Sequence, residues 1–170
     1  MKTNTLTLYS LSYGELKSYL AATAFIAGNI VLPQLFHLVP NGGITFLPIY
    51  FFTLIAAYKY GWKVGLITAL LSPAVNHLLF GMPPLAVLPA ILLKSTLLAM
   101  AAGLAANYFR RISIPILIGV VLGYQLAGTL GEWALTGSFY TAMQDFRIAI
   151  PGMLLQIFGG YALIKYIIYR

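Results

Sequence analysis

The sequence predicts an all-α integral membrane protein: a single domain (1–170) built as a bundle of about six transmembrane helices, with both termini in the cytoplasm. Three observations lead to this fold class. Of the 170 residues, 61% are hydrophobic and 8% are charged, whereas a soluble domain carries about 25% charged residues. The mean hydropathy is +0.89. Long apolar runs alternate with short breaks, and passes of about 20 residues fit this length.

The breaks between the apolar runs define the individual passes. No charged residue lies between Lys17 and Lys59, and Pro40-Asn41-Gly42-Gly43 divides this stretch because Pro and paired Gly interrupt a helix. In the same way, Gly81-Met82-Pro83-Pro84 divides the stretch that ends before Arg110. The predicted passes cover about residues 18–39, 45–58, 64–80, 85–108, 115–131 and 148–166.

The basic residues predict the orientation of the bundle. With both termini in the cytoplasm, most Lys and Arg residues fall on the cytoplasmic side, as the positive-inside rule expects. Glu132 and Asp145, two of the three acidic residues, fall near the outer side instead. The basic residues assigned to the cytoplasmic side are Lys2, Lys17, Lys59, Lys63, Arg110, Arg111, Lys165 and Arg170.

Polar residues inside the passes gather toward the outer side. A charged side chain at the centre of a bilayer costs about 2.5–3.5 kcal/mol on insertion scales, so such residues usually face a cavity or each other. Lys94 lies too deep in its pass for a loop lysine, and Asn76 ends a polar stripe on the third pass. Gln125 and Glu132 lie on one face of the fifth pass because helical residues three or four apart share a face.

These residues predict an outward-facing pocket for a small molecule, covered by the loop after the first pass and the long loop after the fifth. Lys94 or Arg147 would bind an anionic group, and Glu132 or Asp145 a hydrogen-bond donor. Aromatic side chains beside them would stack on a ring of the ligand. The candidate substrate-binding residues are Asn41, Asn76, His77, Lys94, Gln125, Glu132, Trp133, Tyr140, Asp145 and Arg147.

Each of these features also has a purely structural explanation. Lys94 and Glu132 could form an ion pair that only holds the bundle together. A histidine such as His77 more often packs in a core than binds a ligand, and two histidines without any cysteine give no reason to predict a metal site. Trp133 and Tyr140 are also typical of the aromatic belt at a membrane interface.

The sequence lacks the motifs of common catalytic centres. It contains no Gly-x-Ser-x-Gly, no His-Glu-x-x-His and no phosphate-binding Gly-x-x-x-x-Gly-Lys-Ser/Thr, which mark nucleophilic, zinc and nucleotide sites. We therefore expect neither enzymatic activity nor a cofactor, and no ATP hydrolysis by this chain. The net charge of +7 is spread in small groups between apolar runs, so no nucleic-acid partner is expected either.

Four short motifs carry a resemblance to a known family. They are Phe46-Leu47-Pro48, Tyr60-Gly61-Trp62-Lys63-Val64-Gly65-Leu66, Leu71-Ser72-Pro73 and Leu79-Phe80-Gly81-Met82-Pro83-Pro84-Leu85. Over most of its length the chain resembles the substrate-binding S components of energy-coupling factor (ECF) transporters. The resemblance implies a receptor in the plasma or inner membrane that binds a vitamin or related micronutrient at its outer side. Uptake would need a separate transmembrane coupling subunit and two ATP-binding subunits.

The resemblance also implies a surface for the coupling subunit. In that family an Ala-x-x-x-Ala pair on the first helix contacts this partner, and the matching feature here is Ala24-x-x-x-Gly28, with Ala21 on the same face. Small residues let helices approach closely, so Ala21, Ala24 and Gly28 are the expected partner-binding residues. Two alternatives stay open: a stand-alone transporter or channel, which needs a continuous polar path, and a structural or assembly protein, which needs no ligand.

Overall fold

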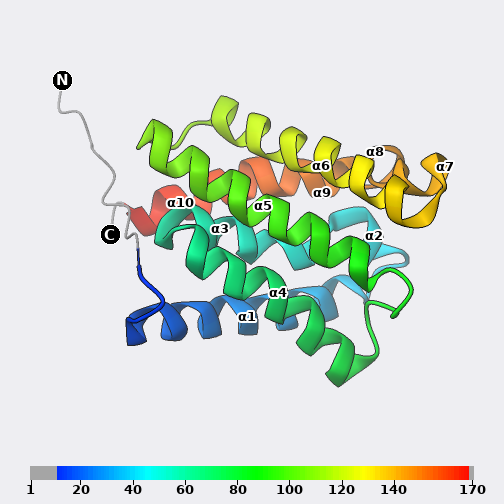
Figure 1. Cartoon of the computed structure of the whole chain (residues 1–170), viewed down its shortest axis with the longest axis horizontal. Helices are drawn as coiled ribbons and strands as arrows, with labels where there is room; N and C mark the ends of the chain where they lie inside the picture. The colour runs from blue at the N-terminus through cyan, green and yellow to red at the C-terminus, as the bar shows by residue number, and fades with distance from the viewer. Residues whose placement is uncertain (1–10, 169–170) are drawn as a thin grey trace.

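The structure, a computed structural model, describes residues 11–168, and all regular elements in that range are helical. Four long helices run along the bundle (Figure 1): α1 (Leu16–Phe36), α4 (Trp62–Phe80), α5 (Leu88–Phe109) and α6 (Ile114–Thr136). Each of the four is long and apolar enough to cross a membrane. The fold is therefore all-α, with four candidate membrane-spanning helices.

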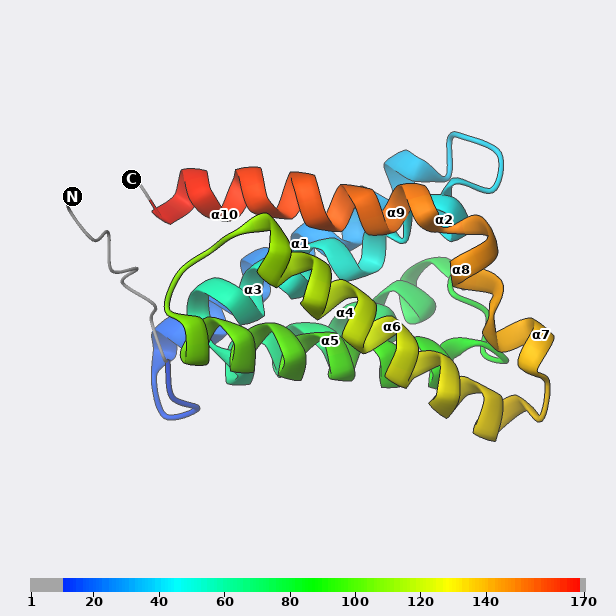
Figure 2. The ribbon, with the colours of Figure 1, turned by 90° about the horizontal axis from the view of Figure 1, so that it is seen from above.

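The other two predicted passes are assembled from short helices. The pieces in the region 45–58 are α2 (Gly42–Phe46), the 3₁₀ turn η1 (Pro48–Tyr50) and α3 (Phe51–Tyr60). Those in the region 148–166 are α9 (Ile150–Leu154), the π-helical turn η2 (Leu155–Gly159) and α10 (Gly160–Ile168). Figure 2 shows α9 and α10 following one another along a single rod beside α6.

The break in the first of these segments has a local cause. Pro48 cannot donate a backbone hydrogen bond, and its ring disfavours the right-handed helical conformation in the residue before it. Leu47 does not continue the helix, and its φ of 47° lies in the left-handed region. The helix therefore stops at Phe46 and restarts at Pro48, which the sequence prediction of one pass over 45–58 did not include.

The segment predicted as a polar loop after the fifth pass is also helical. Helix α6 continues to Thr136, beyond the predicted end at residue 131, and stops at Gly137, whose φ of 69° lies in the left-handed region where Gly is favoured. Two short helices follow, α7 (Phe139–Ala142) and α8 (Gln144–Ile148). Glu132 consequently lies within α6, one residue before its last turn, rather than at the start of a loop.

The bundle has two distinct ends. The described chain begins and finishes at one end, which we call the terminal end; α7 lies at the other, which we call the α7 end (Figure 1). Helix termini and loops at the terminal end contain Lys17, Lys59, Lys63, Arg110, Arg111 and Lys165. Lys2 and Arg170, also predicted on the cytoplasmic side, lie outside the described residues.

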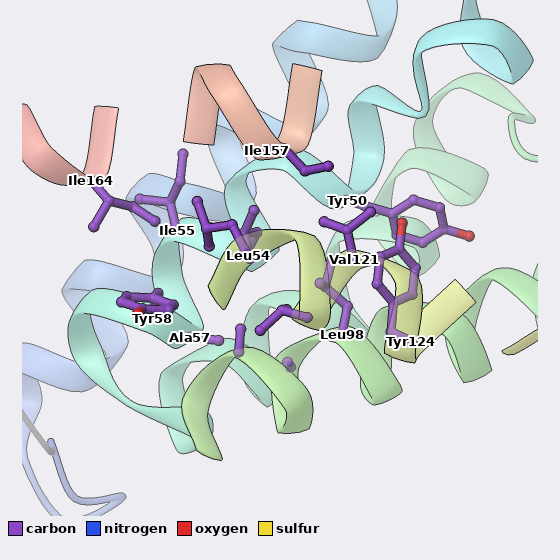
Figure 3. Packing of buried hydrophobic residues seen from close by; sticks show 14 of the residues in the cluster. Tyr50, Leu54, Ile55, Ala57, Tyr58, Leu98, Val121, Tyr124, Ile157 and Ile164 are labelled. Atoms are coloured by element: carbon purple, nitrogen blue, oxygen red, sulfur yellow. The ribbon is translucent and has the colours of Figure 1, made fainter. Parts of the chain in front are cut away.

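The core between α3, α5, α6 and α10 is apolar. Leu54, Leu98 and Val121 are fully buried in it and lie close together in Figure 3. Glycines bring the helices into near backbone contact: a Cβ atom on Gly65 would lie 2.4 Å from the Cβ of Ala57. This close packing fills the space between α3, α5, α6 and α10 with apolar side chains.

Candidate functional site

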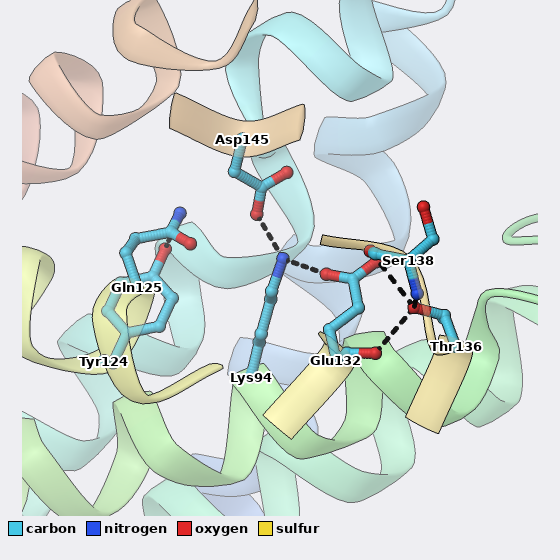
Figure 4. A network of polar contacts seen from close by, with 7 residues as sticks. All are labelled: Lys94, Tyr124, Gln125, Glu132, Thr136, Ser138 and Asp145. Carbon is cyan, nitrogen blue, oxygen red and sulfur yellow. Dashed lines mark hydrogen bonds and ion pairs between the residues drawn. The ribbon is translucent and has the colours of Figure 1, made fainter. Parts of the chain in front are cut away.

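Three charged side chains from three helices converge near the α7 end (Figure 4). The Nζ of Lys94 on α5 lies 2.5 Å from Oε2 of Glu132 on α6 and 2.8 Å from Oδ2 of Asp145 on α8. The three side chains are 5%, 12% and 11% exposed, respectively. We call Lys94, Glu132 and Asp145 the charged triad; it contains one positive and two negative groups.

Small residues on α6 make room for the lysine. A Cβ atom on Gly128 would lie 2.5 Å from Cγ of Lys94, and one on Gly131 would lie 2.4 Å from Cδ2 of Leu93. The Lys94 side chain therefore passes directly over the α6 backbone, one turn before Glu132. Small residues at such positions allow two membrane helices to approach closely.

A second polar layer lies deeper in the bundle than the charged triad. Gln125 donates from Nε2 to the hydroxyl of Tyr124 at 3.1 Å, and this hydroxyl donates to Oε1 of Gln156 at 2.9 Å. The ring of Tyr50 lies 5.8 Å from that of Tyr124, centroid to centroid. Asp145 is within electrostatic range of both tyrosines, so the two layers form one polar cluster.

Several buried polar atoms of this region lack a hydrogen-bond partner among the described residues. They are Ser95 Oγ, Gln125 Oε1, Thr129 Oγ1 and Gln156 Nε2. Leaving such a group unpaired in a protein interior costs about 1–3 kcal/mol. Gln125, Thr129 and Glu132 follow at spacings of four and three, so they share one face of α6. The cluster thus offers unused hydrogen-bonding capacity next to the charged triad.

Three predicted site residues are exposed on the surface near the α7 end and do not belong to the buried polar cluster. Trp133 is exposed and packs its ring 5.3 Å from that of Phe139. Tyr140 is exposed as well, and the guanidinium of Arg147 lies 4.0 Å from the centroid of its ring. Arg147 is thus engaged in a cation–π contact on α7 and α8.

Two other predicted site residues lie at turns between helices. His77 is half-buried, and its Nδ1 lies 2.8 Å from the carbonyl oxygen of Pro83, across the turn between α4 and α5. Asn41 is exposed directly before α2 with a left-handed φ of 56°. Neither belongs to the polar cluster around the charged triad.

Asn76 takes part in a separate buried network. Its Nδ2 donates to the backbone oxygen of Asn29 at 2.9 Å. This oxygen would normally accept from the N–H four residues later, but position 33 is Pro, which has no N–H. The Nδ2 of Asn29 in turn donates to the hydroxyls of Thr53 at 3.0 Å and Ser72 at 3.1 Å. The network therefore joins α1, α3 and α4.

The expected partner-binding residues differ in their surroundings. Ala24 is exposed and Ala21 is half-buried. A Cβ atom on Gly28 would lie 2.7 Å from the ring of Phe52, so this glycine serves packing between α1 and α3. The neighbouring Ala27 is exposed and extends the small-residue surface of Ala24.

Tyr50 and Tyr124 are aromatic members of the polar cluster that the sequence did not single out. The chain contains 12 tyrosines, and both of these stand among apolar neighbours. The one available signal was the position of Tyr124 directly before Gln125. Tyr50 offered none, because its place depends on the turn at Leu47 and Pro48.

Other parts of the described chain offer weaker candidates. Within residues 11–168, no group of three or more His, Cys, Asp or Glu side chains is placed to hold a metal ion. A shallow hollow at the terminal end is lined by Leu104, Ala105, Asn107, Tyr108, Phe109 and Arg110. It includes none of the predicted site residues.

Comparisons with known proteins identify no relative. No protein-family model matches the chain, and no curated protein or solved structure matches it. The features of the chain that bear on its function are therefore the polar cluster at the α7 end and the apolar bundle around it.

Proposed function

We propose that the chain is the substrate-binding S component of an ECF-type uptake transporter. It binds a vitamin or related micronutrient at the outer face of the membrane and delivers it with a separate coupling subunit and two ATP-binding subunits. The buried polar cluster near the α7 end carries this proposal. Buried charges in a membrane helix bundle are costly, and they usually mark a substrate or ion site.

The composition of the cluster supports small-molecule binding. A pure structural ion pair would need one carboxylate for Lys94, but both Glu132 and Asp145 contact it. Unpaired polar atoms of Gln125 and Thr129 lie on the same helix face as Glu132. Sites for small molecules combine an apolar wall with a few converging polar groups in this way.

The segment that covers the cluster supports a receptor that closes over its ligand. Lys94 and Asp145 are 4% and 8% exposed as whole residues, so a ligand reaches them only when α7 and α8 move. These helices are short, and Gly137 begins the segment with a φ of 69°. A few residues that absorb a large backbone change suffice as a hinge.

The apolar core argues against a stand-alone transporter or channel. Such a protein needs a polar path to the other side of the membrane. Toward the terminal end, however, the described helices bury Leu54, Leu98, Leu117 and Val121 against one another. An S component needs no such path, because the family delivers its substrate by toppling in the membrane.

A thermal-stability scan tests the proposal. The detergent-purified full chain is heated alone and with each member of a panel of vitamins and their precursors. A ligand that binds only the folded state stabilises it by about 2.7 kcal/mol at 100 times its dissociation constant. We expect a clear rise of the unfolding midpoint with one compound or a small related group. A folded, ligand-free protein that no compound stabilises would contradict the proposal.

A further inference from the structure

The charge balance of the polar cluster is the starting point for a further inference, which rests on the proposed function. Lys94 is the cation that the described residues place on Glu132 and Asp145. Since both carboxylates contact this one ammonium group, the charged triad has one negative charge in excess. Arg147 on α8 is exposed and lies over the ring of Tyr140, and it forms no ion pair with either carboxylate of the triad.

The position of Glu132 does not compensate this negative charge. It lies one residue before the last turn of α6, which ends at Thr136. The carboxyl end of a helix carries about half a negative charge, so this end of α6 supplies no positive charge to Glu132. A positive group of a ligand would relieve the excess charge.

Unpaired acceptor atoms next to the charged triad also favour a positively charged ligand. Gln125 is fully buried and Thr129 is 4% exposed, yet Gln125 Oε1 and Thr129 Oγ1 have no partner among the described residues. Figure 4 shows Gln125 beside Lys94 and Asp145. An amide oxygen can only accept a hydrogen bond, and a hydroxyl can accept as well. Such atoms complement a ligand group that is rich in N–H donors.

We propose that the site binds a compound with a positively charged nitrogen, such as a protonated amine or a cationic heterocycle. The nitrogen lies against Glu132 and Asp145, where it supplies the positive charge that Lys94 alone does not. Its donors, or those of an adjacent amino group, bond to Gln125 and Thr129. Lys94 keeps the two carboxylates apart and in place.

Matched compounds test this substrate class. Pyridoxamine and pyridoxine differ by an ammonium group in place of a hydroxyl; thiamine is a second cation, and nicotinate and biotin serve as anions. We expect thermal shifts with the purified full chain from cationic compounds, and at least tenfold tighter binding of pyridoxamine than of pyridoxine by titration calorimetry. Shifts from neutral or anionic compounds alone would overturn the substrate class and keep the receptor. No shift from any compound would overturn both.

A variant that removes the charge of Glu132 tests whether this residue causes the preference for cationic compounds. Glu132→Gln keeps the shape of the side chain and leaves one carboxylate for one lysine. It should reduce the preference for pyridoxamine over pyridoxine at least tenfold, whereas purely structural damage would weaken both compounds equally. Glu15→Gln is the matched control, because Glu15 is the remaining acidic residue and is exposed near the terminal end. An unchanged preference in Glu132→Gln would overturn the assignment.

Discussion

At the scale of single residues, Lys94 controls whether the charged triad stabilises or destabilises the bundle. In Lys94→Met, Glu132 and Asp145 would face each other without a cation. Breaking a buried charge pair in this way costs about 3–5 kcal/mol. We expect a clearly lower thermal unfolding midpoint of the purified protein, without loss of membrane insertion, because the variant inserts one charge fewer.

The triple variant Lys94→Met, Glu132→Gln, Asp145→Asn is the control for this prediction. Replacing a whole buried charge cluster by neutral groups is often tolerated, so the triple variant should unfold at a higher temperature than Lys94→Met alone. Equal midpoints for the wild type and Lys94→Met would show that the charged triad contributes nothing to folding.

A second prediction at this scale concerns the amide of Asn76. Its hydrogen bond to the Asn29 oxygen replaces the one that Pro33 cannot make. Asn76→Ala should therefore lower the free energy of unfolding by about 1–3 kcal/mol. The loss should be smaller in a Pro33→Ala background, where the N–H of residue 33 can bond to Asn29 itself. Thermal unfolding of the four proteins measures this coupling, and equal losses in both backgrounds would contradict it.

The residues of the polar cluster were only partly predictable. Lys94, Gln125, Glu132 and Asp145 stand out because polar groups are rare in apolar runs. The sequence did not predict that both carboxylates contact Lys94. That contact requires α8, which places Asp145 over α5, and helix α8 lies within the segment that the sequence predicted as a loop.

At the scale of helices, glycines determine how closely the long helices pack. A Cβ atom at Gly103 would lie 2.7 Å from the Cα of Trp62, and one at Gly65 would lie 2.8 Å from the Cα of Ala57. Because backbone cannot move aside cheaply, Gly65→Ala and Gly103→Ala should each destabilise the protein by about 1–3 kcal/mol. Their thermal unfolding midpoints should fall below that of the wild type.

Gly123→Ala is the matched control for the two packing glycines. Nothing lies within 4 Å of a Cβ atom at this exposed position of α6. Alanine is favoured over glycine in a helix by roughly 0.5–1 kcal/mol, so this variant should unfold at the same or a higher temperature. A midpoint for Gly65→Ala as high as that of Gly123→Ala would contradict the described packing of α3 against α4.

Helix α1 presents small residues on two surfaces, which leads to a separate prediction. Ala24 and Ala27 are exposed, whereas Gly28 packs against Phe52. If the coupling subunit binds the exposed surface, Ala24→Leu and Ala27→Leu should abolish uptake into cells and leave ligand binding by the purified chain intact. Gly28→Leu should lower the unfolding midpoint as well. Unimpaired uptake by both alanine variants would exclude this surface.

The elements themselves were predictable to different degrees. The four long helices follow from long apolar runs, and the end of α4 at Gly81 follows from a glycine in the left-handed conformation. The end of α6 at Gly137 was not predicted, because the polar residues from Glu132 onward suggested a loop. The short helices could not be derived in the same way. An apolar run such as 148–166 does not reveal a π-helical turn, because the extra backbone residue at η2 leaves the hydropathy unchanged.

At the scale of the whole molecule, the two ends differ in charge, and this predicts how the bundle sits in the membrane. Basic residues gather at the terminal end, while the acidic pair Glu132 and Asp145 lies near the α7 end. The positive-inside rule then places the terminal end in the cytoplasm and α7 outside. The four long helices agree with a membrane protein.

Cysteine labelling measures this orientation without background, because the chain contains no cysteine. Asn107 and Thr141 are exposed positions in the last turn of α5 and in α7. In intact cells a membrane-impermeant maleimide should label Thr141→Cys. It should label Asn107→Cys only after permeabilisation, because the predicted orientation places that end in the cytoplasm. The reverse pattern would place the charged triad on the cytoplasmic side and contradict an uptake receptor. Labelling of both variants from outside would mean that α6 does not cross the membrane.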